Sequence, residues 1–445
     1  MADIVEQIRP ARSPAEKSVS AYVYVAAVIV AALILSPLTA ALAKPPITAG
    51  EPVRLDQVRS LGDVIRDSEN GSIHIVYVHG MRAEKPGEAG EFISRLGQSY
   101  GTQGQISRTR RSILLDPWPM GAAVGTRTIW DTEKDWRAGQ PFIDRYVLRT
   151  RRYNASVTVD EVNWWPLLLP LKCRLLVTPE AKVAGVDRAH LDLCFNDTAP
   201  YHRWLTPAEY NEALRTRPPL GGAARFNRYL KQQILDWGLS DAVIATGPMR
   251  PYLNATMDAA FAYAAVDSAS SEYVVISESL GSFVVLDAYS RNEPSVRAVL
   301  DATHNLYFFA NQFSLLELAR IEGLPSEAHA VRADASLSAH PAGAGVAAEA
   351  ASPLRALQAW ASAPSPAGFL PSRSGVKQIV AFSDPSDALT FRVPDFENAL
   401  VSNVYVRNAT RWLGLFADPI KAHAGQMRNE ALWRAMIRES PQPGR

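Results

Sequence analysis

Short apolar runs recur along the chain, and most of them are followed by segments in which apolar residues repeat with a helical period. The apolar runs predict strands at 72–78, 155–165, 274–278, 305–310, 378–382 and 401–406. The periodic segments predict helices at 87–100, 252–265, 283–289, 314–321 and 430–438. Short apolar strands that alternate with helices predict an α/β fold, with a mostly parallel central sheet covered by helices on both faces.

Two segments interrupt this alternation. Residues 166–250 have no clean period, and we expect them to form an inserted cap of helices and loops. Within the cap, Thr206 followed by Pro207 is typical of a helix start. Residues 326–372 are dominated by Ala, Ser, Pro and Gly, which predicts a flexible low-complexity insertion. Residues 45–445 are otherwise expected to form one domain.

The first 44 residues have a different character. Residues 18–43 contain no charged side chain and are long enough to span a bilayer as a helix. Arg9, Arg12 and Lys17 precede this run, which predicts a cytosolic N-terminus and an exported domain. The tripeptide at 41–43, Ala-Leu-Ala, resembles a signal-peptidase site. Two interpretations stay open: a membrane anchor that holds the domain on the periplasmic or extracellular side, or a cleaved signal peptide and a secreted domain.

Composition excludes several classes of protein. The formal net charge is +1, so no basic excess indicates a nucleic-acid partner. Cys173 and Cys194 are too few for a disulfide framework and have no zinc-site pattern. They are either two free thiols or a single bridge in an exported segment. The sequence has no metal-ligand spacing, and we expect neither a metal nor another cofactor; it does not indicate an oligomeric state.

The stretch VVISESLGS at 274–282 runs an apolar strand into small residues and then into a helical segment. A serine at such a turn is lifted clear of the sheet, and the next backbone N–H points at the same place. The turn requires small residues two positions before and two positions after the serine. With Ser279 at the apex, those positions hold Ser277 and Gly281. Ser279 is therefore the candidate nucleophile.

Four segments together resemble the α/β-hydrolase superfamily and extend from about residue 72 to residue 435. They are its nucleophile elbow (VVISESLGS, 274–282), its oxyanion strand (IVYVHGM, 75–81), its strand with the catalytic acid (QIVAFSDPSDALTF, 378–391) and its histidine loop (IKAHAGQMRNEALW, 420–433). The order of serine, acid and histidine along the chain is also that of the superfamily. This chain departs from the usual Gly-x-Ser-x-Gly elbow at Ser277, and the cap and the low-complexity insertion have no counterpart.

The resemblance implies a role for each matched residue. Ser279 would be the nucleophile, His423 the general base and Asp387 the residue that orients the histidine. Met81 and Leu280 would donate backbone N–H groups to the oxyanion. Asp384 is the alternative acid, although it precedes a proline and is also suited to fixing a turn.

Eight histidines occur in the chain, and only one of them lies between the last predicted strand and the last predicted helix. That residue is His423. His79 directly follows a strand, but in the resembled pattern this position packs and hydrogen-bonds to hold the oxyanion loop. We therefore expect a structural role for His79.

The resemblance implies a serine hydrolase that cleaves a carboxylic ester, of a small molecule or a lipid, through an acyl-enzyme intermediate. An acyltransferase or a thioesterase would use the same three residues. The alternative from another class is a non-catalytic, membrane-tethered binding protein with the same fold. The membrane contact is expected through residues 18–43 in either case.

Overall fold

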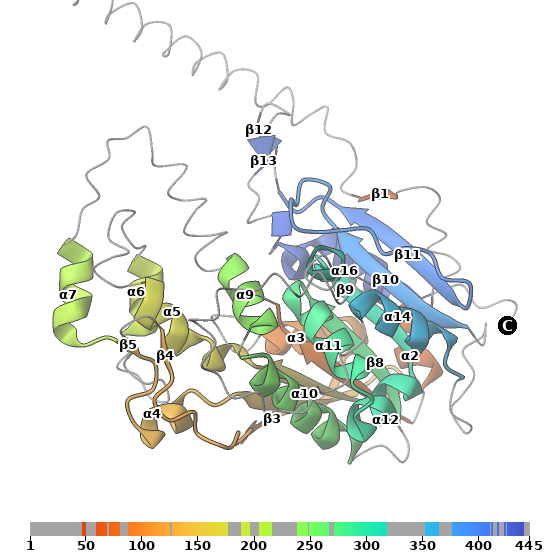
Figure 1. Cartoon of the computed structure of the whole chain (residues 1–445). Helices are drawn as coiled ribbons and strands as arrows, with labels where there is room; N and C mark the ends of the chain where they lie inside the picture. Colours follow the sequence, from red (N-terminus) through yellow and green to blue (C-terminus); the bar gives the residue numbers. More distant parts are fainter. Residues whose placement is uncertain are drawn as a thin grey trace, which may run out of the picture.

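The fold is seen in a computed structural model of the whole chain (Figure 1). The structure describes residues 47–49, 59–68, 71–80, 88–124, 127–176, 188–195, 204–215, 238–247, 249–266, 271–317, 352–364, 376–409, 411–412, 416–417, 422–423 and 425–439. The predicted membrane segment 18–43 and Met81 lie outside these residues. None of the helices described is both long and apolar enough to cross a bilayer.

A nine-stranded sheet forms the centre of the molecule, in the order β1-β11-β10-β9-β8-β2-β7-β6-β3 (Figure 1). Six strands run parallel: β2 (Ser72–Val78), β7 (Ser156–Asn163), β8 (Ser271–Glu278), β9 (Thr303–Phe309), β10 (Lys377–Ser383) and β11 (Ala399–Val406). Three antiparallel strands complete the edges: β1 (Ile47–Ala49), β3 (Thr102–Ser112) and β6 (Phe142–Thr150). The predicted α/β class with a mostly parallel sheet is confirmed.

Each of the six parallel strands corresponds to a predicted apolar run. In β9 and β10 every residue is buried, and these two runs lack a clear apolar and polar alternation because both faces of the sheet are covered there. Along β2, Ile75 and Tyr77 belong to one core and Val76 and Val78 to the other. Two hydrophobic cores therefore lie on opposite faces of the sheet.

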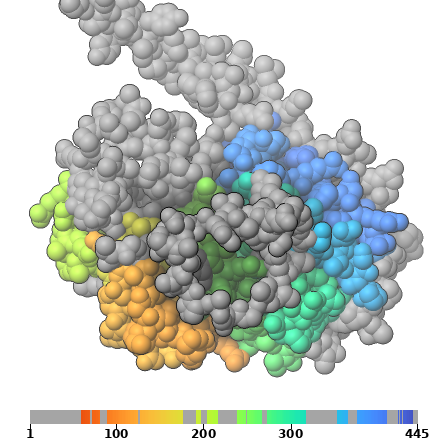
Figure 2. Space-filling view, viewed as in Figure 1, coloured from red at the N-terminus to blue at the C-terminus, as the bar shows by residue number. Residues whose placement is uncertain are grey.

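Helices cover both cores. One face carries α2 (Leu61–Asp67), α3 (Glu88–Tyr100) and α16 (Glu430–Ile437). The other face carries α10 (Arg250–Ala265), α11 (Leu280–Ser290), α12 (Pro294–Ala302) and α14 (Pro353–Ser362). In the space-filling view, the C-terminal segments in blue and the segments near residues 100–150 in orange lie on opposite sides of the visible face (Figure 2). This arrangement agrees with the strand order, in which β11 and β3 are near opposite edges.

The structure differs from the sequence prediction at several elements, among them the unpredicted helices α2 and α12 and the three that follow here. The strands β3 and β6 were not predicted, and positions 103–112 of β3 are all exposed, so no apolar pattern marks this edge strand. The predicted low-complexity insertion was too wide, because residues 353–362 within it form α14. Ser352 caps α14, and Trp360 is buried and donates its indole N–H to the carbonyl of Leu300 at 2.8 Å.

The described parts of the predicted cap, residues 166–250, are helical. They are the end of η1 (Trp165–Leu167), then α5 (Leu169–Leu176), α6 (Arg188–Cys194), α7 (Pro207–Arg215), α9 (Ser240–Thr246) and the start of α10. The hydroxyl of Thr206 accepts the N–H of Glu209 at 3.2 Å, as its predicted capping role requires. A disulfide joins Cys173 in α5 to Cys194 in α6, with Cα atoms 5.6 Å apart. Both cysteines are buried and belong to the hydrophobic core on the same face of the sheet as α10 and α11.

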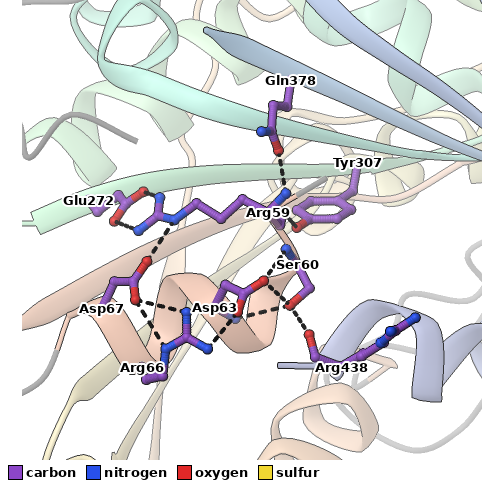
Figure 3. A network of polar contacts seen from close by, with 9 residues as sticks. All are labelled: Arg59, Ser60, Asp63, Arg66, Asp67, Glu272, Tyr307, Gln378 and Arg438. Carbon is purple, nitrogen blue, oxygen red and sulfur yellow. Dashed lines mark hydrogen bonds and ion pairs between the residues drawn. The ribbon is translucent and has the colours of Figure 1, made fainter. Parts of the chain in front are cut away.

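A polar network connects Arg59, just before α2, to the strands β8 and β10 (Figure 3). The Arg59 guanidinium forms a two-pronged ion pair with Glu272 and also contacts Asp67 at 3.2 Å, while the Arg59 backbone N–H donates to Gln378 Oε1 at 2.9 Å. Glu272 and Gln378 are the second residues of β8 and β10. The network therefore lies at the amino ends of the strands, away from the edge where Ser279 follows β8. Because these contacts saturate Arg59, we assign the network to structure.

Candidate active site

Ser279 is the single residue that connects β8 to α11. It directly follows β8, directly precedes α11, and has φ 51° and ψ −122°. Left-handed backbone is uncommon for a residue with a Cβ and costs about 1–3 kcal/mol, so it persists only where the surroundings impose it. Here the Ser279 N–H donates to the carbonyl of Phe309 at 2.7 Å, and Ser282 Oγ donates to the Ser279 carbonyl at 2.6 Å.

Two glycines allow the neighbouring backbones to approach the Ser279 turn. A Cβ added to Gly281 would lie 2.5 Å from the carbonyl oxygen of His79. A Cβ added to Gly80 would lie 2.5 Å from the Cβ of Ser279. Both contacts are far shorter than a van der Waals separation. Ser277, which stands where the superfamily usually has glycine, lies opposite Val78 in the sheet and is fully buried.

The structure brings together the three side chains that the resemblance grouped. Ser279 Oγ lies 2.7 Å from His423 Nε2, and His423 Nδ1 lies 2.7 Å from Asp387 Oδ2. The side chain of Asp387 is 1% exposed and that of His423 is 15% exposed, so water reaches the imidazole but hardly the carboxylate. A carboxylate can only accept, so Nδ1 carries the imidazole proton and Nε2 is left to accept from the Ser279 hydroxyl.

The two aspartates after β10 have different partners. Asp387 accepts from His423 and from the backbone N–H of Leu389 at 2.9 Å, and it also contacts the Thr390 hydroxyl. Asp384 accepts three backbone N–H groups, from Ser386 at 2.7 Å, Asn408 at 2.6 Å and Ala409 at 3.1 Å. Asp384 therefore fixes the turn and the loop after β11, whereas Asp387 faces the imidazole.

One of the two predicted oxyanion donors, Leu280, lies among the described residues. Leu280 is the first residue of α11, where backbone N–H groups have no partner within the helix and the helix dipole is positive. Its side chain is buried and apolar, so its backbone N–H is the group that could contact an oxyanion. Met81, the other predicted donor, directly follows Gly80 but lies outside the described residues.

His79 directly follows β2 and contacts Glu161, a buried acid that sequence reasoning missed. Its Nε2 is 2.7 Å from Glu161 Oε1, and neither residue is exposed. Glu161 also accepts the backbone N–H of Ala89 at 3.1 Å, and Trp164 donates to the His79 carbonyl at 2.9 Å. These contacts tie the end of β2 to β7 and α3, which agrees with the structural role expected for His79.

Gln312 is a second residue that sequence reasoning missed. It follows β9, is 2% exposed, and places its Nε2 atom 3.4 Å from His423 Nε2. The side chain of its neighbour Asn311 donates to the Phe391 carbonyl at 2.9 Å, in the loop that carries Asp387. A polar pair directly after a buried strand is the sequence signal that could have drawn attention to Gln312.

A Ser–His–Asp hydrogen-bond chain of this geometry can activate the serine hydroxyl for attack on a carbonyl carbon. Among the described residues, no group of three or more His, Cys, Asp or Glu side chains is arranged to hold a metal ion. Comparison with protein-family models, with curated proteins and with solved structures gives no match.

Proposed function

We propose that this protein is a serine hydrolase with an α/β-hydrolase fold that cleaves carboxylic esters. The single observation that supports this most strongly is the unbroken hydrogen-bond chain from Ser279 through His423 to Asp387, with 2.7 Å at each step. It assembles from three segments that are far apart in sequence, since Ser279 and His423 are separated by 144 positions and Asp387 and His423 by 36. Chance packing seldom aligns three such groups at the carboxyl ends of parallel strands, where α/β proteins place their chemistry.

In the proposed reaction, Ser279 Oγ attacks the ester carbonyl while His423 Nε2 takes the hydroxyl proton. The oxygen that becomes negative is stabilised by the N–H of Leu280 and by that of Met81, and each such donor is typically worth about 10²–10³ in rate. His423 then returns the proton to the leaving alcohol, and an acyl-Ser279 ester remains. Asp387 orients the imidazole and stabilises its charged form. Water completes the cycle by releasing the acid.

Several features favour catalysis over the alternative of a binding module. A binding protein has no need of a left-handed serine, yet Ser279 adopts this conformation in a buried position. Asp384 and Asp387 divide structure and chemistry between them, and only Asp387 contacts the histidine. An acyltransferase or a thioesterase would share these features, and the choice among them depends on the acyl acceptor and on the leaving group.

We further propose that the chain is exported and held on the outer face of a membrane by residues 18–43; cleavage after Ala43 would instead release it. The disulfide between Cys173 and Cys194 supports export, because such bridges persist in oxidising compartments. The uncharged run and its basic flank support the orientation.

The register of β1 supports a substrate at the membrane. Ile47 pairs with Val406, at the carboxyl end of β11. Ser279 also follows the carboxyl end of a parallel strand, β8. The four steps from residue 43 to Ile47 reach at most about 14 Å. The length of β11 is about 26 Å. A connection of at most about 14 Å therefore cannot start at the amino ends of the parallel strands. We therefore favour a lipid or another membrane-associated ester as the substrate.

The test compares ester hydrolysis by the full chain in detergent with that of Ser279→Ala, using p-nitrophenyl esters of increasing acyl length and the matching thioesters. Ser279→Ala is expected to lose on the order of 10⁴-fold or more in kcat/KM. Ser290→Ala, at the far end of α11, is the matched control and should retain wild-type activity. Equal hydrolysis by the two variants would contradict the proposal.

A further inference from the structure

Gln312 reaches the catalytic histidine because the chain turns sharply after β9. Ala310 has a φ of 49°, and its N–H donates to the carbonyl of Phe382 at 2.9 Å on the adjacent strand β10. A left-handed alanine is unusual, and it redirects the chain from the sheet across the Ser279 turn. Gln312 then lies beside the start of α11, since its own N–H approaches Ser282 Oγ at 3.5 Å, and the preceding Asn311 contacts the loop of Asp387 through the Phe391 carbonyl.

The side chain of Gln312 is buried although its structural bonds are made by its backbone. The Gln312 carbonyl accepts the N–H groups of Leu315 and Leu316, each at 3.1 Å, at the start of α13 (Phe313–Glu317). The amide of the side chain contacts His423 Nε2 at 3.4 Å. Placing a polar amide in a position that is 2% exposed costs free energy unless the amide has a partner. The contact with His423 is therefore the role that we assign to this buried amide.

His423 Nε2 has a single lone pair, and in the free enzyme Ser279 Oγ occupies it at 2.7 Å. The Gln312 contact is longer and is secondary in this state. In an acyl-enzyme the Ser279 oxygen is part of an ester and has no proton to donate. His423 Nε2 then needs a new donor, and that donor is the water that must attack the acyl carbon.

We propose that Gln312 holds this hydrolytic water between His423 Nε2 and the acyl carbon, an inference that rests on the proposed serine-hydrolase function. The amide has both an acceptor oxygen and two donor hydrogens, so it can bind water beside the imidazole. The water oxygen bonds to the acyl carbon, and His423 Nε2 takes one water proton. The bond from that carbon to Ser279 Oγ then breaks, and His423 returns the proton to Oγ, which leaves a carboxylic acid and free serine.

The test measures how the acyl-enzyme divides between water and a competing nucleophile. Full-length enzyme is given a p-nitrophenyl ester in the presence of hydroxylamine, and the ratio of hydroxamate to carboxylic acid is determined. After subtraction of the hydroxamate and acid that form without enzyme, this ratio depends only on the step after acylation. Gln312→Met, which keeps the length of the side chain but cannot hold water, is expected to raise the ratio about tenfold or more, because positioning of a proton-transfer partner contributes about 10²–10⁴. Gln103→Met, at an exposed position of β3, is the matched control and should leave the ratio unchanged.

Gln312→Glu provides a second variant, since it keeps the side-chain shape and an acceptor oxygen. It is expected to give a ratio between those of wild type and Gln312→Met, and this readout does not depend on the amount of folded enzyme. A hydroxamate-to-acid ratio that is the same in wild type and in both variants would overturn the role of Gln312. Failure of the proposed function looks different: the ester would then be hydrolysed equally well by Ser279→Ala, or wild type would form no hydroxamate above the level seen without enzyme.

Discussion

Ser279 combines a strained backbone with a hydroxyl that touches an imidazole. Glycine at this position would relieve the left-handed conformation, so the presence of serine indicates that the hydroxyl is needed. Its surroundings are arranged for the same purpose, because the absence of a Cβ at Gly80 and Gly281 lets the end of β2 lie against the turn. Ser279 therefore combines backbone strain, close packing against the end of β2 and contact with the base His423.

The two aspartates after β10 should respond differently to the same substitution. Asp387→Asn removes the acceptor that keeps the His423 proton on Nδ1, so kcat is expected to fall by about 10³–10⁴-fold with little change in fold. Asp384→Asn replaces an acceptor of three backbone N–H groups, so it should lower the melting temperature more than it lowers kcat. Steady-state kinetics and thermal unfolding of both variants provide the measurement. A larger loss of kcat in Asp384→Asn would move the acid to that residue.

At the residue scale, the order of elements along the chain was informative for three residues. Ser279, Asp387 and His423 each follow a strand, and the structure brings these side chains into contact. Gln312 could not be predicted in this way, because its contact with His423 depends on the left-handed turn at Ala310, and alanine gives no sign of such a turn. Long-range proximity of this kind is decided by tertiary packing.

At the scale of elements, the apolar runs predicted the six parallel strands, and the signal is clearest in β9 and β10, where every residue is buried. The edge strand β3 has the opposite character, with arginines that interact with acids and rings of β6. Arg110, for example, pairs with Asp144 at 2.7 Å and lies 4.0 Å from the ring centre of Phe142. A charged edge also discourages pairing with another chain. Such a strand is stabilised by its neighbour and not by its own pattern.

The junction of β8 and α11 should tolerate no added methyl group. Gly281→Ala would place a Cβ 2.5 Å from the His79 carbonyl oxygen, and both groups belong to backbone that cannot easily move. We expect the free energy of unfolding to fall by about 1–3 kcal/mol, together with most of the esterase activity, because the Ser279 turn must shift. Urea unfolding and kinetics of this variant check the prediction. Gly104→Ala, where nothing lies within 4 Å of the added Cβ although φ is 75°, measures backbone strain without a clash.

At the scale of the whole molecule, one sheet separates two polar regions. The carboxyl ends of β8 and β10 lead to Ser279 and Asp387, and the amino ends hold the Arg59 network (Figure 3). The alternation of elements predicted this sheet, but not the network, because Arg59 precedes the first predicted strand and gives no sign of its partner in β8. Its ion pair with Glu272 depends on tertiary contacts.

Stability should depend on pH through Lys377, the first residue of β10. Its ammonium donates to the Trp360 carbonyl at 2.7 Å, and burial lowers the pKa of Lys377 from 10.5 to about 8; Asp301 opposes the shift and Arg297 adds to it. Between these two pH values the unfolded chain binds a proton that the folded chain does not, so raising the pH removes a cost of folding. Relative to Lys377→Met, wild type should gain free energy of unfolding from pH 8 to about pH 10.5. Urea unfolding that gives parallel pH profiles for the two proteins would exclude this contribution.

The most direct test of the central claim, that Ser279 is an activated nucleophile, is covalent labelling of the full chain with a fluorophosphonate followed by mass spectrometry of its peptides. The adduct is expected on the peptide that contains Ser279 in wild type. It should be lost in Ser279→Ala and strongly slowed in His423→Ala, because the serine then has no base. Labelling of equal extent in wild type and in Ser279→Ala, or an adduct on another residue, would contradict the proposed nucleophile.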